Sequence, residues 1–108
     1  MTSFIEIQIT SATEDEAIRL GKILVEAKLA ACAQISGPIQ SIYVWEGAQE
    51  SAQEWVCCLK SRESLFSELV AVVRKHHSYQ CPQIVAVPIL KTNDDYLQWM
   101  EEMTKLQS

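Results

Sequence analysis

The only two histidines of the chain, His76 and His77, are adjacent in the segment from Arg74 to Pro82. Imidazole is the commonest metal-binding side chain in proteins and titrates near neutral pH. Cys81 follows within the same segment, so a thiol also lies close in sequence to both histidines. Metal binding is therefore the first chemistry that this segment predicts.

The spacing of the two histidines limits how they can bind an ion. Adjacent residues of a helix point about 100° apart. His76 and His77 can therefore share one ion only if the helix has already unwound there, or if a second subunit supplies further ligands. The alternative is that one histidine complements the negative end of the helix dipole while the other is solvated.

The cysteines do not form a recognisable redox or zinc motif. No Cys-x-x-Cys spacing occurs among Cys32, Cys57, Cys58 and Cys81, and a strand would direct Cys57 and Cys58 to opposite faces. Cys32 and Cys57 lie among apolar residues, where a thiol behaves as a small hydrophobic side chain. Residues 11–13 contain no cysteine, which excludes a copper(I) chaperone with two thiolates in the first loop.

Catalytic patterns are also missing. No Ser-His-Asp set and no informative pair of carboxylates is visible, and Cys81 beside the histidines is the only conceivable nucleophile with a base. We therefore expect a binding protein and no enzyme.

Composition restricts the class of protein further. A chain of 108 residues with 48% hydrophobic content predicts one domain over residues 1–108, small enough to gain stability by assembling with its own copies. The net charge of -5 disfavours nucleic acid and anionic lipid as partners. No segment has the apolar length of a membrane span, and the N-terminus lacks the pattern of a signal peptide, so we expect no membrane insertion and a cytoplasmic location.

The N-terminal half predicts a strand, a helix and a long hairpin. Apolar residues alternate with polar ones over residues 5–10, and Thr13 with Glu16 forms a capping box for a helix that ends near Lys28. Gly21 within this helix indicates a close approach to the sheet. Residues 29–45 form one long strand bent at Gly37-Pro38, the polar residues 46–50 form a turn, and residues 54–60 form the returning strand.

The C-terminal half predicts a helix, an edge strand and a last helix. Ser61 caps the second helix, an apolar stripe follows, and the helix stops at the histidines. Residues 78–83 form a loop. Residues 84–90 form a strand whose Pro88 places it at an edge or ends it early. Residues 92–95 begin a short helix with four large apolar side chains on one side: Tyr96, Trp99, Met100 and Met103.

This order of elements predicts an α+β fold. A β-α-β-β-α-β chain gives a four-stranded antiparallel sheet with helices on one face, the ferredoxin-like arrangement, here with an additional C-terminal helix. The other face of the sheet then needs a cover, and packing against other copies of the chain is the simplest one.

Four sequence blocks, in order, resemble the CutA family of divalent-cation tolerance proteins. They cover residues 28–33 (KLAACA), 41–47 (SIYVWEG), 76–84 (HHSYQCPQI) and 95–99 (DYLQW). The resemblance implies a ferredoxin-like homotrimer built like the PII signalling proteins. It also implies binding of copper(II) and a role in the response to metal ions.

The resemblance also implies roles for particular residues. His76 and His77 match the copper-binding histidines of the family, whereas Ile9 stands where the family has a third ligand, a cysteine. Ser78, Gln80 and Gln83 stand where the family has proline, glutamate and glutamate. A second set matches positions that cluster in a cleft between subunits: Trp45, Glu46, Lys60, Tyr79 and Trp99. These residues would either bind a small ligand there or serve as interface anchors, with Lys60 and Glu46 forming an ion pair.

Two functions follow from these observations. The first is a trimeric metal-tolerance protein that binds copper(II) or a similar divalent ion weakly. The alternative is a PII-like signalling or scaffold protein whose intersubunit clefts bind a small anionic metabolite or a protein partner.

Overall fold

The computed structural model describes residues 3–106, and these form a mixed α+β fold. The element order agrees with the sequence prediction. The elements are β1 (Phe4–Ser11), α1 (Glu14–Glu26), β2 (Cys32–Trp45), β3 (Ala48–Arg62), α2 (Phe66–His76), β4 (Ile84–Pro88) and α3 (Asp94–Met103). The predicted domain also includes residues 1, 2, 107 and 108, which lie outside the described part of the chain.

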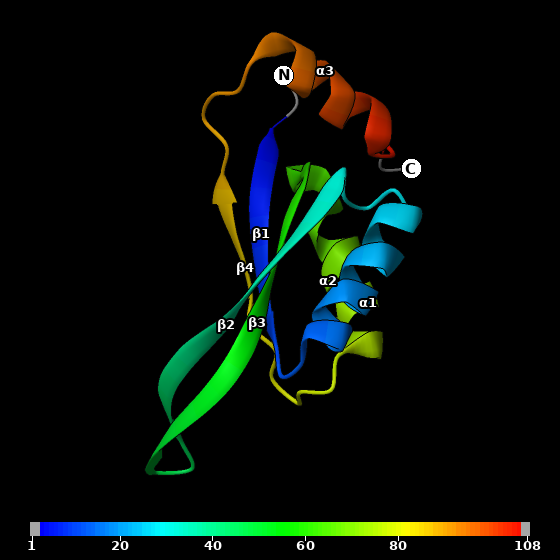
Figure 1. Cartoon of the computed structure of the whole chain (residues 1–108). Helices are drawn as coiled ribbons and strands as arrows, with labels where there is room; N and C mark the ends of the chain where they lie inside the picture. The colour runs from blue at the N-terminus through cyan, green and yellow to red at the C-terminus, as the bar shows by residue number, and fades with distance from the viewer. Residues whose placement is uncertain (1–2, 107–108) are drawn as a thin grey trace.

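The four strands form one antiparallel sheet in the order β2-β3-β1-β4. Helices α1 and α2 cover one face of this sheet (Figure 1). Strand β4 lies at the edge and ends at Pro88, as the missing amide hydrogen of proline predicted. The core lies between the sheet and the two helices, and its fully buried members include Ile7, Ile9, Leu59, Leu20, Leu24, Leu69 and Val73.

Gly21 marks the point where α1 approaches the sheet most closely. A Cβ atom added there would lie 2.8 Å from the Cβ of Ala33 on β2. Since real Cβ contacts are essentially never that short, only glycine fits between helix and strand without a shift of one of them. The close approach predicted from the sequence is confirmed.

The β2–β3 hairpin extends well beyond the rest of the sheet. Strand β1 pairs with β3 only from Trp55 onward, so residues 39–45 and 48–54 pair with each other and with no third strand. Glu46 and Gly47 alone form the turn, with φ angles of +51° and +82°. Both angles are positive, which is the requirement of a two-residue type I′ turn. The predicted turn over residues 46–50 was therefore too long.

Helix α2 begins later than the sequence predicted. Strand β3 continues through Ser61 to Arg62, which pairs with Phe4 of β1. The Ser61 hydroxyl is buried and donates a hydrogen bond to the carbonyl of Leu29. The prediction of Ser61 as a helix cap was therefore wrong, and a 3-10 turn (Glu63–Leu65) leads into α2.

Helix α3 lies across one end of the sheet (Figure 1). Met100 packs there against Phe4 and Ala31 in a small second core. Trp99 and Met103, predicted on the same side of the helix, are both more than a third exposed. One side of α3 is therefore only partly covered within a single chain.

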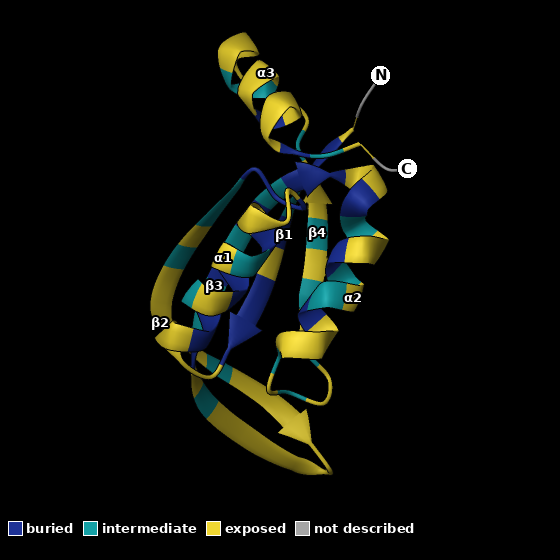
Figure 2. Ribbon diagram, turned by 90° about the vertical axis from the view of Figure 1, so that its right-hand side faces the viewer, coloured by how far each residue is buried: buried dark blue, intermediate teal, exposed yellow. Residues whose placement is uncertain are grey.

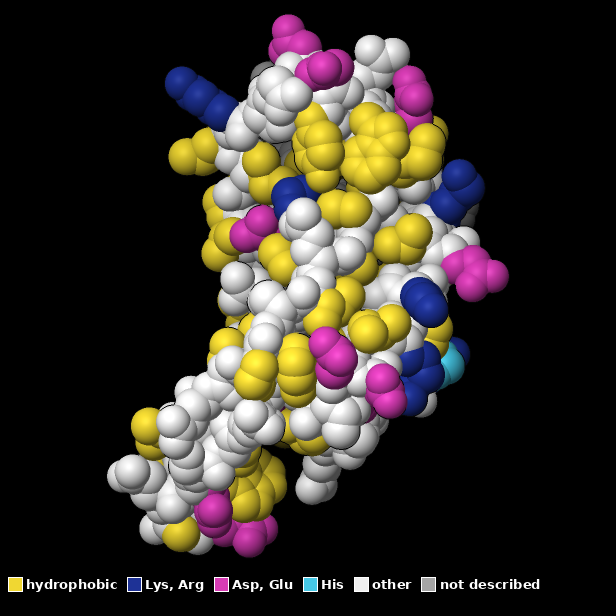
Figure 3. All heavy atoms as spheres, viewed as in Figure 1, with side chains coloured by type: hydrophobic (Ala, Val, Ile, Leu, Met, Phe, Trp, Pro, Cys, Tyr) yellow, Lys and Arg dark blue, Asp and Glu magenta, His cyan; other side chains and the backbone are white. Residues whose placement is uncertain are grey.

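Large apolar side chains remain exposed away from the helices that cover the sheet. They lie on β2, on β4 and in the segment between β4 and α3, and include Ile42, Val44, Trp45, Val85, Val87 and Leu90. The overhanging hairpin is exposed along nearly all of its length (Figure 2), and hydrophobic side chains extend from α3 to the hairpin (Figure 3). No helix within residues 3–106 combines the length and the apolar character that a bilayer crossing requires.

Candidate functional site

The two histidines lie at the C-terminal end of α2, where the sequence placed them, but in different environments. His76 is the last residue of the helix and is exposed. Its backbone carbonyl accepts a hydrogen bond of 3.2 Å from the Arg19 guanidinium of α1. The side chain of His77 has no exposed surface. Only His76 therefore presents its imidazole to solvent.

Both ring nitrogens of His77 form hydrogen bonds with backbone groups. Nε2 donates to the carbonyl of Thr10 at 2.7 Å, and Nδ1 accepts from the amide of Tyr79 at 3.0 Å. An amide N–H can only donate, so Nδ1 carries no proton and the imidazole is the neutral Nε2–H tautomer. A metal ion would have to displace one of these hydrogen bonds to bind His77.

Glu16 fixes the loop that follows the histidines. Its carboxylate accepts hydrogen bonds from the amide and the hydroxyl of Ser78, at 2.7 and 3.0 Å. Its own amide donates to the Thr13 hydroxyl, so Thr13 caps α1 as predicted. The Glu16 carboxylate is turned to the loop instead of back to the amide of Thr13, so the capping box is only half formed. Glu16 thereby joins the start of α1 to the end of α2.

The other predicted ligands and nucleophiles do not gather at the histidines. Ile9, at the position of the family cysteine, is fully buried in the main core. Cys81 is exposed, and within residues 3–106 no hydrogen bond joins it to either histidine. The same residues contain no group of three or more His, Cys, Asp or Glu side chains that could hold a metal ion. Within residues 3–106, a single chain therefore does not bring three such ligands together.

The remaining thiols lie in the sheet. Cys57 is buried against the helices, and burial raises the pKa of its thiol to about 12. Cys58 points to the opposite face, as the strand geometry predicted. The sulfur of Cys32 lies 3.5 Å from the Tyr96 hydroxyl of α3, and this hydrogen bond, together with partial burial, raises the pKa of Tyr96 to about 12.

A single chain does not bring the five predicted cleft residues together at one site. Trp45 and Tyr79 line one pocket, and Glu46 lies in the hairpin turn. Trp99 packs against Tyr96 on α3, with ring centroids 5.3 Å apart. Within one chain Lys60 lies 3.7 Å from Glu6 and donates to Gln34, so its ion pair there is with Glu6, and a pair with Glu46 stays a prediction. A cleft between subunits stays a prediction.

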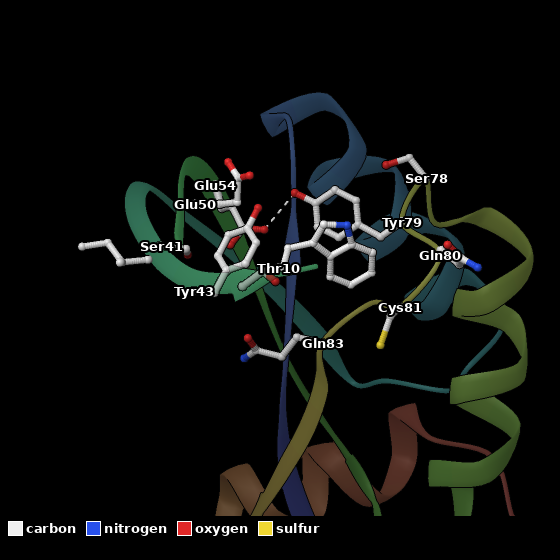
Figure 4. A pocket seen from close by; sticks show the side chains of 12 residues that line it. Thr10, Ser41, Tyr43, Glu50, Glu54, Ser78, Tyr79, Gln80, Cys81 and Gln83 are labelled. Carbon is white, nitrogen blue, oxygen red and sulfur yellow. Dashed lines mark hydrogen bonds between the residues drawn. The ribbon is translucent and has the colours of Figure 1, made fainter. Parts of the chain in front are cut away.

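The pocket at Tyr79 has a volume of about 710 Å³ (Figure 4). The overhanging hairpin supplies one side of it, including Tyr43 and Glu50. The loop after α2 supplies the other side, including Cys81. The Tyr79 hydroxyl, on the loop side, donates a hydrogen bond of 2.8 Å to the carboxylate of Glu54 on β3, and this bond links the two sides.

Glu54 and Tyr79 are the most unusual polar pair of the pocket. Glu54 is only 7% exposed, although it belongs to the overhanging part of β3, next to Trp55, where pairing with β1 begins. Burial, and then the hydrogen bond and charge of Glu54, raise the pKa of Tyr79 well above its ordinary value of 10. Tyr79 therefore remains a neutral donor. The burial of Glu54 could not be predicted from the sequence, because a glutamate that follows several polar residues on a strand carries no signal of burial.

These features define a class of protein: a small α+β domain with a four-stranded antiparallel sheet, three helices and a pocket beside an overhanging hairpin. Known proteins with this architecture were found by comparison. The family model described as "CutA1 divalent ion tolerance protein" matches residues 5–103. The crystal structure of CutA1 from Oryza sativa superposes with a TM-score of 0.94 at 33% identity, over 97% of this chain and 96% of that one.

Curated relatives agree with the family model. The divalent-cation tolerance protein CutA of Archaeoglobus fulgidus is 42% identical over 96 residues, which are 89% of this chain and 93% of that protein. The protein named "Protein CutA, chloroplastic" of Arabidopsis thaliana is 35% identical over 101 residues, and the chain spans only 56% of its length. The chain belongs to the CutA1 divalent ion tolerance protein family.

Proposed function

We propose that this protein acts in tolerance to divalent cations as a homotrimer that binds copper(II) weakly through His76. The observation that carries the metal site is the contrast at the end of α2, where His76 is exposed and both nitrogens of His77 are engaged. Imidazole suits copper(II). His77 then serves to hold the chain segment that presents His76.

The exposed apolar surface supports assembly into a trimer. The face of the sheet opposite α1 and α2 carries half-exposed valines, Val85 and Val87, and the hairpin carries Ile42 and Val44. A monomer would leave this surface in water, and closed symmetric assembly is the usual way to bury such a face. The long hairpin can reach a neighbouring copy because it overhangs its own sheet.

Light scattering coupled to size exclusion tests the assembly. We expect a particle of three times the chain mass of 12.2 kDa at micromolar concentration. Val44→Glu should shift the particle to lower mass, because a charge would enter an apolar interface without a partner. Glu26→Gln, at the exposed end of α1, is the control. A wild-type particle of 12.2 kDa would contradict the proposal.

Calorimetric titration with copper(II) tests the metal site. We expect the metal-free assembly to bind copper(II) saturably and His76→Ala to weaken this binding by about tenfold or more, because the only exposed imidazole is lost. His77→Ala is the matched comparison, and its binding is read at a temperature where circular dichroism shows it folded. Unchanged binding in His76→Ala would remove His76 from the site.

The same variants test the cellular role. In cells that lack their own CutA1-type protein, the wild-type chain should support growth at copper(II) concentrations where the His76→Ala chain does not. Equal growth with both chains, at equal protein levels, would show that copper tolerance does not depend on His76.

The cytoplasm is the compartment that we propose. All four cysteines are free thiols, as in compartments where glutathione and thioredoxin keep thiols reduced.

A further inference from the structure

The Glu54 carboxylate lacks a positively charged partner. It is 7% exposed and accepts one hydrogen bond, from the neutral hydroxyl of Tyr79. Within residues 3–106 the lysines that form ion pairs do so with Glu6 and Glu68, and no ion pair involves Glu54. Burial of a carboxylate without a cation is unfavourable, and buried charges in proteins are normally paired. A buried carboxylate in this setting favours a positively charged group in the pocket.

The other side chains that line the pocket also favour a positively charged ligand. Glu50 adds a second carboxylate at the more exposed side, and Lys, Arg and His contribute nothing to the described lining. Tyr43 and Trp45, both partly exposed, supply aromatic rings from the hairpin. Aromatic faces attract cations through the ring quadrupole. Negative charge and aromatic walls thus favour the same kind of ligand.

The chemistry of the lining favours an organic cation over a metal ion. The described part of the chain contains no set of three or more acidic, thiol or imidazole side chains at metal-binding distance. A volume of about 710 Å³ lies in the range of sites for small organic molecules. The aromatic side chains can pack against carbon, while one carboxylate can pair with one charged nitrogen group.

From these observations we infer that the pocket between the β2–β3 hairpin and the loop after α2 binds an organic cation, an alkylammonium or guanidinium group, with Glu54 as its counter-ion. Glu54 lies beneath the ligand and Tyr79 fixes the carboxylate through its hydroxyl. Tyr43 and Trp45 flank the charged group. This activity goes beyond metal tolerance and uses neither His76 nor His77, which do not line the pocket.

The cation can come from two sources. It is either a free small molecule or a lysine or arginine side chain of a neighbouring copy in the assembly. Both present the same charged group to Glu54, and they differ in whether an added small cation can enter the pocket. An experiment on the assembled protein separates them.

The probes are n-butylammonium and n-butylguanidinium chloride, titrated calorimetrically at constant ionic strength, with n-pentanol and butyrate as neutral and anionic controls. We expect saturable binding of the cations only, weakened about tenfold or more by Glu54→Gln, because the neutral amide keeps the shape and loses the charge. Glu26→Gln makes the same change of net charge at the exposed end of α1, outside the pocket, and should bind as the wild type does. Glu50→Gln, which keeps the buried carboxylate, should weaken binding less than Glu54→Gln.

Thermal unfolding gives a second readout in the same samples. The cations should raise the melting temperature of the wild type and of Glu26→Gln, and leave that of Glu54→Gln unchanged. If Glu54→Gln does not fold, Glu50→Gln carries the test, because its carboxylate is exposed and its loss should weaken cation binding measurably without affecting the fold.

The remaining outcomes decide the source or overturn the proposal. If a neighbouring copy supplies the cation, the free probes do not bind, and Glu54→Gln, unlike Glu26→Gln, dissociates the assembly at higher protein concentration. The proposal is overturned if the probes bind Glu54→Gln as tightly as the wild type. It is equally overturned if nothing binds and both variants dissociate alike.

Discussion

Replacement of His77 by alanine is expected to lower the free energy of unfolding by about 2–5 kcal/mol. The imidazole has no exposed surface and bonds two backbone groups from different parts of the chain, the Thr10 carbonyl and the Tyr79 amide. Alanine would leave both groups without their partner and a cavity where the ring lay. The effect is measured by urea denaturation at one fixed protein concentration, since stability of an oligomer depends on concentration.

The neighbouring His76→Ala variant is the matched control. His76 is exposed, and the hydrogen bond that it accepts from Arg19 goes to its backbone carbonyl, which the substitution retains. Its stability should therefore change by less than about 0.5 kcal/mol. Equal losses of stability in the two variants would show that the His77 hydrogen bonds do not hold the loop. That result would also reopen His77 as a metal ligand.

Much of the fold could be predicted because local signals and the sheet agreed. The alternation of Ile5, Ile7 and Ile9 predicts a half-buried strand, and all three isoleucines lie in the core. Gly21 predicts a close helix-to-sheet contact, which exists because a Cβ there would overlap with Ala33. In both cases the residue type meets a requirement of its immediate neighbours, so the sequence carries the information.

The errors arose where tertiary contacts override local preference. Ser61 has the residue type of a helix cap, but pairing with β1 extends β3 past it and buries its hydroxyl. The residues after Gly47 are polar and resemble a loop, but they form a strand because they pair with residues 39–45 of β2. Polarity there reflects exposure, and the two-residue turn keeps the strands paired up to Trp45 and Ala48.

The site was harder to predict than the fold because its partners are far apart in sequence. His77 is 67 residues from Thr10, and Ser78 is 62 residues from Glu16. No local pattern reveals that the second histidine holds these segments together. Ser78 illustrates the same point: its amide donates to Glu16, which the proline of the family at this position could not do.

Arg62 is a buried cation with a structural role at the end of β3. Arg62, at the end of β3, is only 6% exposed and lies beneath the end of α3. Its Nη2 donates to the Glu101 carbonyl at 2.8 Å, and its Nε donates to the Thr104 hydroxyl at 2.9 Å. Thr104 in turn donates to the Met100 carbonyl at 2.7 Å. Two carbonyls of the last helical turn, which have no partner within the helix, are satisfied in this way.

Arg62→Ala is expected to release α3 and lower the free energy of unfolding by about 3–5 kcal/mol, since two charge-assisted hydrogen bonds and the stacking on Phe4 are lost together. Trypsin cleavage after Lys91, in the segment before α3, should accelerate in the same variant.

Two control variants separate the contributions of Arg62. Arg62→Met retains much of the packing volume and separates the loss of hydrogen bonds from the loss of packing. Arg74→Ala, at an exposed position of α2, controls for the change of charge. If Arg62→Ala were as stable and as resistant to trypsin as Arg74→Ala, α3 would be held by its apolar contacts alone. The helix end gives the physical reason to expect otherwise: its carbonyls carry the negative end of the dipole, and the buried guanidinium is the positive charge that faces them.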